Sequence, residues 1–223
     1  MDIDGTLIDN CPEKDYSQEQ LIRGNPILAV IRDVMVEEGW DPAVAGKSIE
    51  GLAGEIIWWD YPDFMAEFHL PTVRTWERIC QWHDENLSVY QDTVATVRAL
   101  HGLGKKLFIA SNNPIVGCIY KLRRAGLSDG WSAPCFRRIL GTNNLRGQKS
   151  LREFWLRAVA QSGIEPKRIA TIGDNENEDG DVPLAAGIGR AFIIDRHLDT
   201  ESANVGGKLF IREPSVILSF FSR

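Results

Sequence analysis

Residues 1–7 read MDIDGTL, and the rest of the chain is organised around this short stretch. If its first residues form the end of a β-strand, alternation sends the side chains of Asp2 and Asp4 to the same side. Gly5 then permits a sharp turn, because glycine adopts backbone conformations that other residues avoid. Two carboxylates on one side can divide a displacement reaction, in which one attacks and the other moves protons.

The size and composition of the chain indicate a globular protein. Its 223 residues suit one core of average size that carries an insertion. Hydrophobic residues make up 43% of the sequence and charged residues 25%, which is typical of a soluble chain with a real core. The formal net charge of −6 argues against nucleic acid or an anionic membrane as the main partner, and the oligomeric state stays open.

The cysteines and the N-terminal composition bear on location. The four cysteines are widely spaced and form no Cys-x-x-Cys pair, which favours buried thiols in a reducing compartment over a zinc site or a disulfide framework. No basic region followed by an apolar stretch opens the sequence, and no run approaches the ~18 apolar residues of a membrane span. We therefore predict a cytoplasmic protein.

The hydrophobic pattern divides the chain into two parts. Residues 10–88 show helical spacing without a convincing strand, and Pro62 breaks an aromatic segment at 58–64. The remainder alternates strands with helices, which is typical of parallel pairing through crossover units. The expected helices lie at 26–40, 48–59, 72–87, 92–103, 114–125 and 149–162, and the expected strands at 105–110, 136–140, 168–172, 191–194 and 208–211.

This pattern predicts an α/β fold with an open parallel sheet and helices on both faces. The helical stretch interrupts the pattern directly after the first strand, so it is most simply a separate small domain. We predict a catalytic core formed by residues 1–12 and 90–223 and an all-helical cap domain at residues 13–89.

Polar residues follow three of the expected strands, and ligands of open α/β sheets bind outside such carboxyl ends. Each of them has a simpler interpretation as a helix cap, a turn former or a solvated charge. Their shared placement favours a single site instead. The residues concerned are Asp2 and Asp4, then Ser111, Asn112 and Asn113, then the acidic segment 173–179, with Lys149 at the start of the intervening helix.

In this order the motifs resemble those of the haloacid dehalogenase-like superfamily, a group of aspartate-nucleophile phosphatases and phosphotransferases. The resemblance spans nearly the whole chain and implies that family's Rossmann-like core. It rests on DIDGT at residues 2–6, LFIAS at 107–111 followed by Asn112, Lys149, and Gly173-Asp174 with Asp179.

The resemblance implies a role for each matching residue. Asp2 would attack phosphorus to form an aspartyl-phosphate, and Asp4 would protonate the leaving oxygen and later deprotonate water. Ser111, Asn112 and Lys149 would bind the phosphoryl oxygens, where phosphoryl transfer requires positive charge and hydrogen-bond donors.

The resemblance also implies a Mg²⁺ ion, since hard oxygen ligands select that cation. Asp2, the main-chain carbonyl of Asp4, and Asp174 would hold it, with Asp179 as a nearby acid or water-mediated ligand. The acidic residues that compete with Asp179 for this place are Glu178 and Asp181.

Asp4 separates activities within the family. Dehalogenation expels halide, which needs no proton, so a general acid at the Asp4 position would have no role in that reaction. We therefore expect a Mg²⁺-dependent phosphomonoester hydrolase that acts on a small phosphorylated metabolite. The alternatives are a phosphomutase or phosphotransferase of the same superfamily, and a non-catalytic binding protein that keeps the fold.

Two features depart from the family pattern. The family runs several hydrophobic residues into the nucleophile, whereas only Met1 precedes Asp2 here. Either upstream residues are missing from this sequence, or the central strand is short and a charged α-amino group lies beside the nucleophile, in which case we expect a weakened fold and poor activity. Lys149 is followed by Ser150 where the family commonly has proline.

Overall fold

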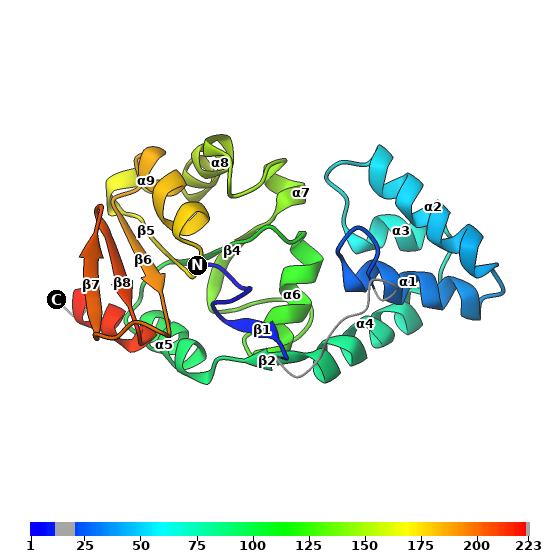
Figure 1. Ribbon diagram of the computed structural model, residues 1–223, viewed down its shortest axis with the longest axis horizontal. Coiled ribbons are helices and arrows are strands. Elements are labelled where there is room, and N and C mark those ends of the chain that lie inside the picture. The colour runs from blue at the N-terminus through cyan, green and yellow to red at the C-terminus, as the bar shows by residue number, and fades with distance from the viewer. Residues whose placement is uncertain (12–20, 222–223) are drawn as a thin grey trace. The chain divides into compact units, whose positions relative to one another are not determined.

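The computed structural model describes residues 1–11 and 21–221, which belong to two compact units (Figure 1). One unit comprises Met1–Asp9 with Val89–Arg223, and the other comprises Asn10–Ser88. The chain passes between them through two short paired strands, β1 (Ile8–Asn10) and β2 (Leu87–Val89). The predicted boundary between residues 12 and 13 lies outside the described residues. A capping role for Asn10–Ser88 stays a prediction.

The larger unit has the predicted α/β architecture. Two groups of strands form its sheet, and parallel pairs predominate, as expected for strands joined by crossover helices. An antiparallel strand, which the sequence pattern did not predict, closes one edge. The first group pairs β3 (Leu107–Ala110) with β4 (Phe136–Leu140), and the second has the order β5 (Ala170–Gly173), β6 (Arg190–Ile194), β8 (Lys208–Ile211) and the antiparallel β7 (Ser202–Val205).

The first residues of the chain lie between these two groups. The Met1 amino group donates a hydrogen bond to the carbonyl of Phe108 at 2.8 Å, and the Ala110 amide donates to the Met1 carbonyl at 2.9 Å. On the other side, the Asp2 amide donates to the Ile172 carbonyl at 2.9 Å. Figure 1 shows the N-terminus between β4 and β5. Met1 and Asp2 therefore act as a very short central strand between β3 and β5.

A largely apolar cavity of about 590 Å³ adjoins Met1. Its walls come from β3, β5 and the helix at Arg152–Ser162, and they include Phe108, Val159 and Ile172. Burial lowers the pKa of the Met1 ammonium to about 6. This burial therefore works against the charged form of the α-amino group that was expected beside Asp2.

Helices cover both faces of the sheet, as predicted (Figure 1). On one side, Phe154 and Trp155 pack with Ala186 against Ala110 and Leu140 of the strands. The helical elements of this unit are α5 (Gln91–Gly102), α6 (Ile115–Arg124), α7 (Thr142–Leu145), α8 (Arg152–Ser162), η2 (Pro166–Arg168), η3 (Glu176–Asp181), α9 (Val182–Ala185) and η4 (Pro214–Phe220).

The smaller unit consists of helices around a core of its own. Buried Ile27, Ile31, Phe64 and Ile79 belong to this core, and within the first helix the buried residues Ile27, Ile31 and Val34 follow the helical repeat. Asn25, Asp41 and Asp60 accept backbone hydrogen bonds at helix starts, as N-cap residues do. The helices are α1 (Pro26–Glu37), α2 (Pro42–Glu55), α3 (Tyr61–Glu67) and α4 (Thr72–Asn86).

The predicted helix at residues 48–59 was wrong in its bounds, because α2 starts at Pro42 and ends at Glu55. Residues 61–64 of the aromatic segment that Pro62 was expected to break instead form the start of α3. Proline is accepted there because the first helical turn leaves its amide groups without intrahelical partners. None of the helices in the described part of the chain is long and apolar enough to cross a membrane.

Candidate active site

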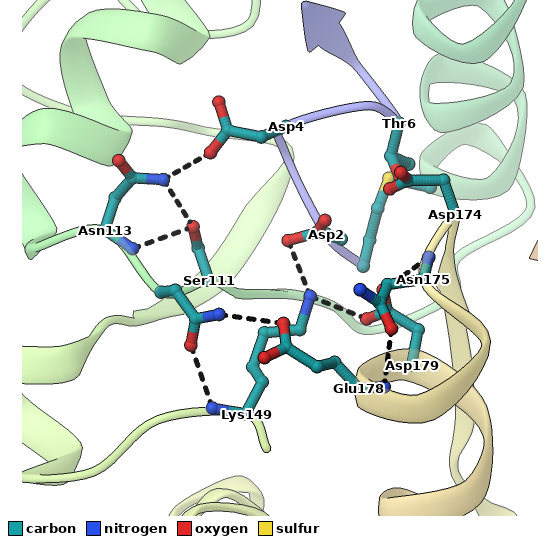
Figure 2. Close-up of polar contacts among 12 residues, drawn as sticks. Asp2, Asp4, Thr6, Ser111, Asn113, Lys149, Asp174, Asn175, Glu178 and Asp179 are labelled. Atoms are coloured by element: carbon teal, nitrogen blue, oxygen red, sulfur yellow. Dashed lines mark hydrogen bonds and ion pairs between the residues drawn. The ribbon is translucent and has the colours of Figure 1, made fainter. Parts of the chain in front are cut away.

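A buried ion-pair cluster joins residues from three parts of the larger unit (Figure 2). The Lys149 ammonium lies 2.8 Å from a carboxylate oxygen of Asp2 and 2.7 Å from one of Asp179. The exposed fractions of these residues are 2% for Lys149, 7% for Asp2 and 1% for Asp179. The fold thus places the predicted nucleophile, the predicted phosphate-binding lysine and one predicted metal-site acid in direct contact.

Local hydrogen bonds hold Lys149 in this position. Its amide donates to the side-chain oxygen of Asn112 at 2.8 Å, and its carbonyl accepts from the Trp155 indole at 2.9 Å. The Asn112 amide group also donates to Glu178 at 2.8 Å. Asn112, which was predicted to bind phosphate, therefore links two loops with both ends of its side chain.

Asp179 is fixed by the turn that follows β5. The Asn175 side chain accepts from the amides of Asn177 and Glu178, and the Thr171 hydroxyl donates to the Asp179 carbonyl at 2.6 Å. A Cβ atom at Gly173 would lie 2.1 Å from the Asp179 carboxyl carbon, so only glycine leaves room for this carboxylate. Of the three acids that competed in the sequence, Asp179 is the one in the cluster, since Glu178 contacts Asn112 and Asp181 pairs with Lys208.

The cluster shifts the ionisation of its members. Burial raises the pKa of the Asp2 carboxyl to about 7, although the adjacent Lys149 ammonium opposes this rise. Burial likewise raises the pKa of Asp179, again against the effect of Lys149. For Lys149, burial alone would lower the pKa, but the two carboxylates outweigh it and raise the pKa above its ordinary value. The two carboxylates therefore favour the protonated, cationic form of Lys149.

Asp2, Asp174 and Asp179 could together hold a metal ion. Their carboxylate oxygens lie within 4.8 Å of one another. The Thr6 hydroxyl donates to Asp174 at 2.9 Å and orients it. Gly5, with φ +70°, allows the close approach, because a Cβ atom there would lie 2.1 Å from an Asp174 oxygen. A hard divalent cation such as Mg²⁺ fits a set of carboxylate oxygens of this kind.

The Asp4 carboxylate is contacted at both of its oxygens. The Asn113 side-chain amide donates to one oxygen at 2.5 Å, and the Lys121 ammonium lies 2.6 Å from the other. Burial works to raise the pKa of Asp4, but the charge and hydrogen bond of Lys121, together with Asn113, lower it below its ordinary value. The side chain is 48% exposed, so water also reaches this carboxylate.

Lys121 was not predicted as a site residue, and Asn113 was noted only as part of a polar strand end. Lys121 lies seven residues after Pro114, and two helical turns return a side chain to the same face. A long side chain on a helix leans toward the N-terminus, which here is the end next to Asn113. That spacing is the signal in the sequence that could have identified Lys121.

Ser111 lies at the end of β3, where it was predicted to bind phosphate. It is 1% exposed, and its hydroxyl oxygen accepts hydrogen bonds from the backbone amide and the side-chain amide of Asn113, at 3.1 and 2.9 Å. The hydroxyl proton of Ser111 is therefore not used in either hydrogen bond with Asn113. Asp2, Asp4, Ser111, Lys149, Asp174 and Asp179 all belong to one site in the larger unit (Figure 2).

Comparison with known proteins agrees with this geometry. A family model described as haloacid dehalogenase-like hydrolase matches residues 1–187. A HAD phosphatase from Thermococcus onnurineus shares 22% identity with a TM-score of 0.58, over 98% of this chain and 94% of that one. A 2-haloacid dehalogenase from Pseudomonas syringae pv. Tomato shares 17% identity with a TM-score of 0.59, over 100% of this chain and 96% of that one.

A protein assigned as a beta-phosphoglucomutase from Thermotoga maritima is also similar, with 18% identity and a TM-score of 0.54 over 99% of this chain and 96% of that one. No curated protein matches the chain in sequence. At these identities the structural likeness establishes the fold. It does not choose among phosphatase, mutase and dehalogenase, so that choice depends on the residues of the site.

Proposed function

Because the chain belongs to the haloacid dehalogenase-like hydrolase family, we propose that it is a Mg²⁺-dependent phosphomonoester hydrolase that acts on a small phosphorylated metabolite. One observation carries the choice of reaction: a second carboxylate, Asp4, lies beside the Ser111–Asn113 loop in addition to the buried Asp2. A halide leaves without a proton, whereas an alkoxide needs one. A proton-transferring carboxylate therefore supports phosphoryl transfer over dehalogenation.

In the proposed first step, an Asp2 carboxylate oxygen attacks phosphorus and the bond from phosphorus to the leaving oxygen breaks. The leaving oxygen takes a proton from Asp4. In the second step, Asp4 takes a proton from water as the water oxygen attacks phosphorus, and the bond from phosphorus to Asp2 breaks. Inorganic phosphate leaves, and both aspartates return to their starting state.

The basic and polar residues stabilise negative charge in both steps. Lys149 provides a fixed buried cation next to Asp2, in a region where low polarity strengthens electrostatic attraction. Asp2, Asp174 and Asp179, with the main-chain carbonyl of Asp4, are proposed to hold Mg²⁺, which would neutralise phosphoryl oxygens when bound. Without that cation, three acids would repel an anionic substrate.

Release of phosphate from para-nitrophenyl phosphate and from a panel of phosphorylated metabolites tests the proposal. We expect release that requires Mg²⁺ and disappears in Asp2→Asn. The matched control is Asp199→Asn, which changes an exposed aspartate and should keep wild-type activity.

Two results would contradict the proposed hydrolase. One is the absence of phosphate release together with chloride release from an α-chloro carboxylic acid. The other is transfer of the phosphoryl group within a sugar phosphate that exceeds its loss to water, which would identify a phosphomutase.

A further inference from the structure

The contacts of Asp4 form a closed triangle of side chains. Lys121 lies 2.6 Å from one Asp4 oxygen and donates to the side-chain oxygen of Asn113 at 3.1 Å. Asn113 in turn donates to the other Asp4 oxygen at 2.5 Å. Each carboxylate oxygen thus has its own donor, and both donors also contact each other. This arrangement restricts rotation of the carboxylate about its Cβ–Cγ bond.

We propose that Lys121 and Asn113 are positioning residues for the second half of the reaction, where they hold the Asp4 carboxylate in the orientation that accepts a proton from the attacking water. The inference rests on the proposed function, because it assigns these residues to a step of that reaction. It adds two residues to the site, and neither was among the predicted catalytic, phosphate-binding or metal-binding residues.

The geometry suits an acceptor. A carboxylate oxygen can accept more than one hydrogen bond, so each Asp4 oxygen keeps room for a water molecule after the contact with Lys121 or Asn113. The Lys121 side chain is only 13% exposed, whereas Asp4 is 48% exposed, so the lysine supports the carboxylate from the protein side and leaves it open to water.

The step itself balances without a further reactant. Water gives one proton to Asp4, its oxygen forms a bond to phosphorus, and the bond from phosphorus to Asp2 breaks to regenerate the Asp2 carboxylate. Asp4 then carries the proton that the next leaving oxygen receives. A misoriented Asp4 would slow the attack of water and leave the phosphoryl group on Asp2.

Rapid-mixing kinetics with para-nitrophenyl phosphate separate the two halves, because para-nitrophenolate is a good leaving group that needs little help from an acid. In Lys121→Met we expect a burst close to one para-nitrophenolate per protein molecule, followed by steady-state turnover at least about tenfold slower than wild type, a fraction of what a general base contributes. The phosphoryl group should accumulate on the protein during the burst.

Three further variants complete the test. Lys121→Arg, which keeps a donor, should recover most of the steady-state rate, and Asn113→Ala should give the same burst as Lys121→Met. Lys167→Met is the matched control, because Lys167 is an exposed lysine of η2, and it should behave as wild type. Melting temperatures of all four verify that they are folded.

The inference is overturned if the burst and the steady-state rate fall together in folded Lys121→Met and Asn113→Ala, or if neither variant changes turnover. A wild-type protein that releases no phosphate would instead refute the proposed function, and that result is distinct from either of these.

Discussion

At the scale of single residues, the central feature is a lysine that lies between two buried carboxylates. Burying a charge is costly unless it is paired, and the Lys149 ammonium pairs with Asp2 and with Asp179. The three groups carry a net charge of one negative unit when all are ionised. A bound cation would neutralise that excess, which explains why a metal site and a buried lysine can share these acids.

Replacing Lys149 with methionine should therefore destabilise the fold as well as abolish activity. Removing one partner of a buried ion pair costs about 3 kcal/mol, because the remaining charge loses its compensation. Urea unfolding of Lys149→Met should show a loss of that order relative to wild type, and Lys167→Met should show none. A stability of Lys149→Met equal to that of wild type would indicate that the cluster is not formed in solution.

The raised pKa of Asp2 predicts how activity depends on pH. Attack requires the carboxylate form, and the pKa of this carboxyl is about 7. At limiting Mg²⁺, kcat/KM should therefore rise as the pH rises through about 7. Saturating Mg²⁺ favours the carboxylate form, so the rise should move to lower pH. A rise at the same pH at every Mg²⁺ concentration would contradict the placement of the ion next to Asp2.

Sequence reasoning could find the residues that lie at strand ends, because the carboxyl ends of parallel strands meet at one edge of a sheet. Asp2, Asp174 and Ser111 belong to this group. Lys121 was missed because it approaches the site from the second turn of α6 and does not follow a strand end. The engagement of Asn112 with Glu178 was likewise invisible before folding.

At the scale of elements, the central strand of the sheet is very short. Met1 and Asp2 connect β3 and β5 through three backbone hydrogen bonds, and a largely apolar cavity of about 590 Å³ continues between the same strands. A residue placed ahead of Met1 would follow the same parallel register. It would accept from the Ile172 amide and donate to the Ala170 carbonyl, since both face the same side as the Ile172 carbonyl that binds Asp2.

An engineered extension tests this reading of the cavity. Four β-branched apolar residues fused ahead of Met1 should raise the melting temperature by about 5 °C or more, because each buried side chain contributes on the order of 1 kcal/mol. A four-residue glycine and serine extension is the matched control and should leave the melting temperature unchanged. An equal effect of the two extensions would mean that the cavity does not accept a strand.

Glycines at the ends of the first strand and β5 allow the carboxylates to approach one another. In Gly173→Ala the new methyl group would lie 2.1 Å from the Asp179 carboxyl carbon, so the acid must move. We expect a loss of about 1–3 kcal/mol in stability and weaker Mg²⁺ binding, measured by unfolding and by titration calorimetry. Gly51→Ala is the control, because a Cβ atom at this α2 position meets nothing within 4 Å and should stabilise the helix by up to about 1 kcal/mol.

Most elements of the larger unit follow from periodicity and could be predicted, since alternating strands and helices have distinct patterns. Two predictions, one in each unit, were wrong for local reasons. Pro62 was interpreted as a break, although it lies in the first turn of α3. The strand β7 was missed because its residues are mostly exposed, and strand pairing across a sheet edge leaves no strong hydrophobic pattern.

At the scale of the whole molecule, motifs that are far apart in the sequence converge in the larger unit. Segments more than 170 residues apart meet at the Asp2 and Asp179 contacts to Lys149, and the family match covers residues 1–187. The fold is shared with phosphatases and dehalogenases, so the activity depends on a few side chains. The proposed reaction depends above all on attack by Asp2.

Trapping the phosphoryl group on the protein tests this role of Asp2. Protein mixed with Mg²⁺ and a radiolabelled phosphomonoester would be quenched in acid within one turnover, digested and mapped by mass spectrometry. We expect the labelled phosphoryl group on Asp2 in the wild-type protein and no label on Asp2→Asn. A label on any other residue, or phosphate release from wild type without any protein-bound phosphoryl group, would contradict it.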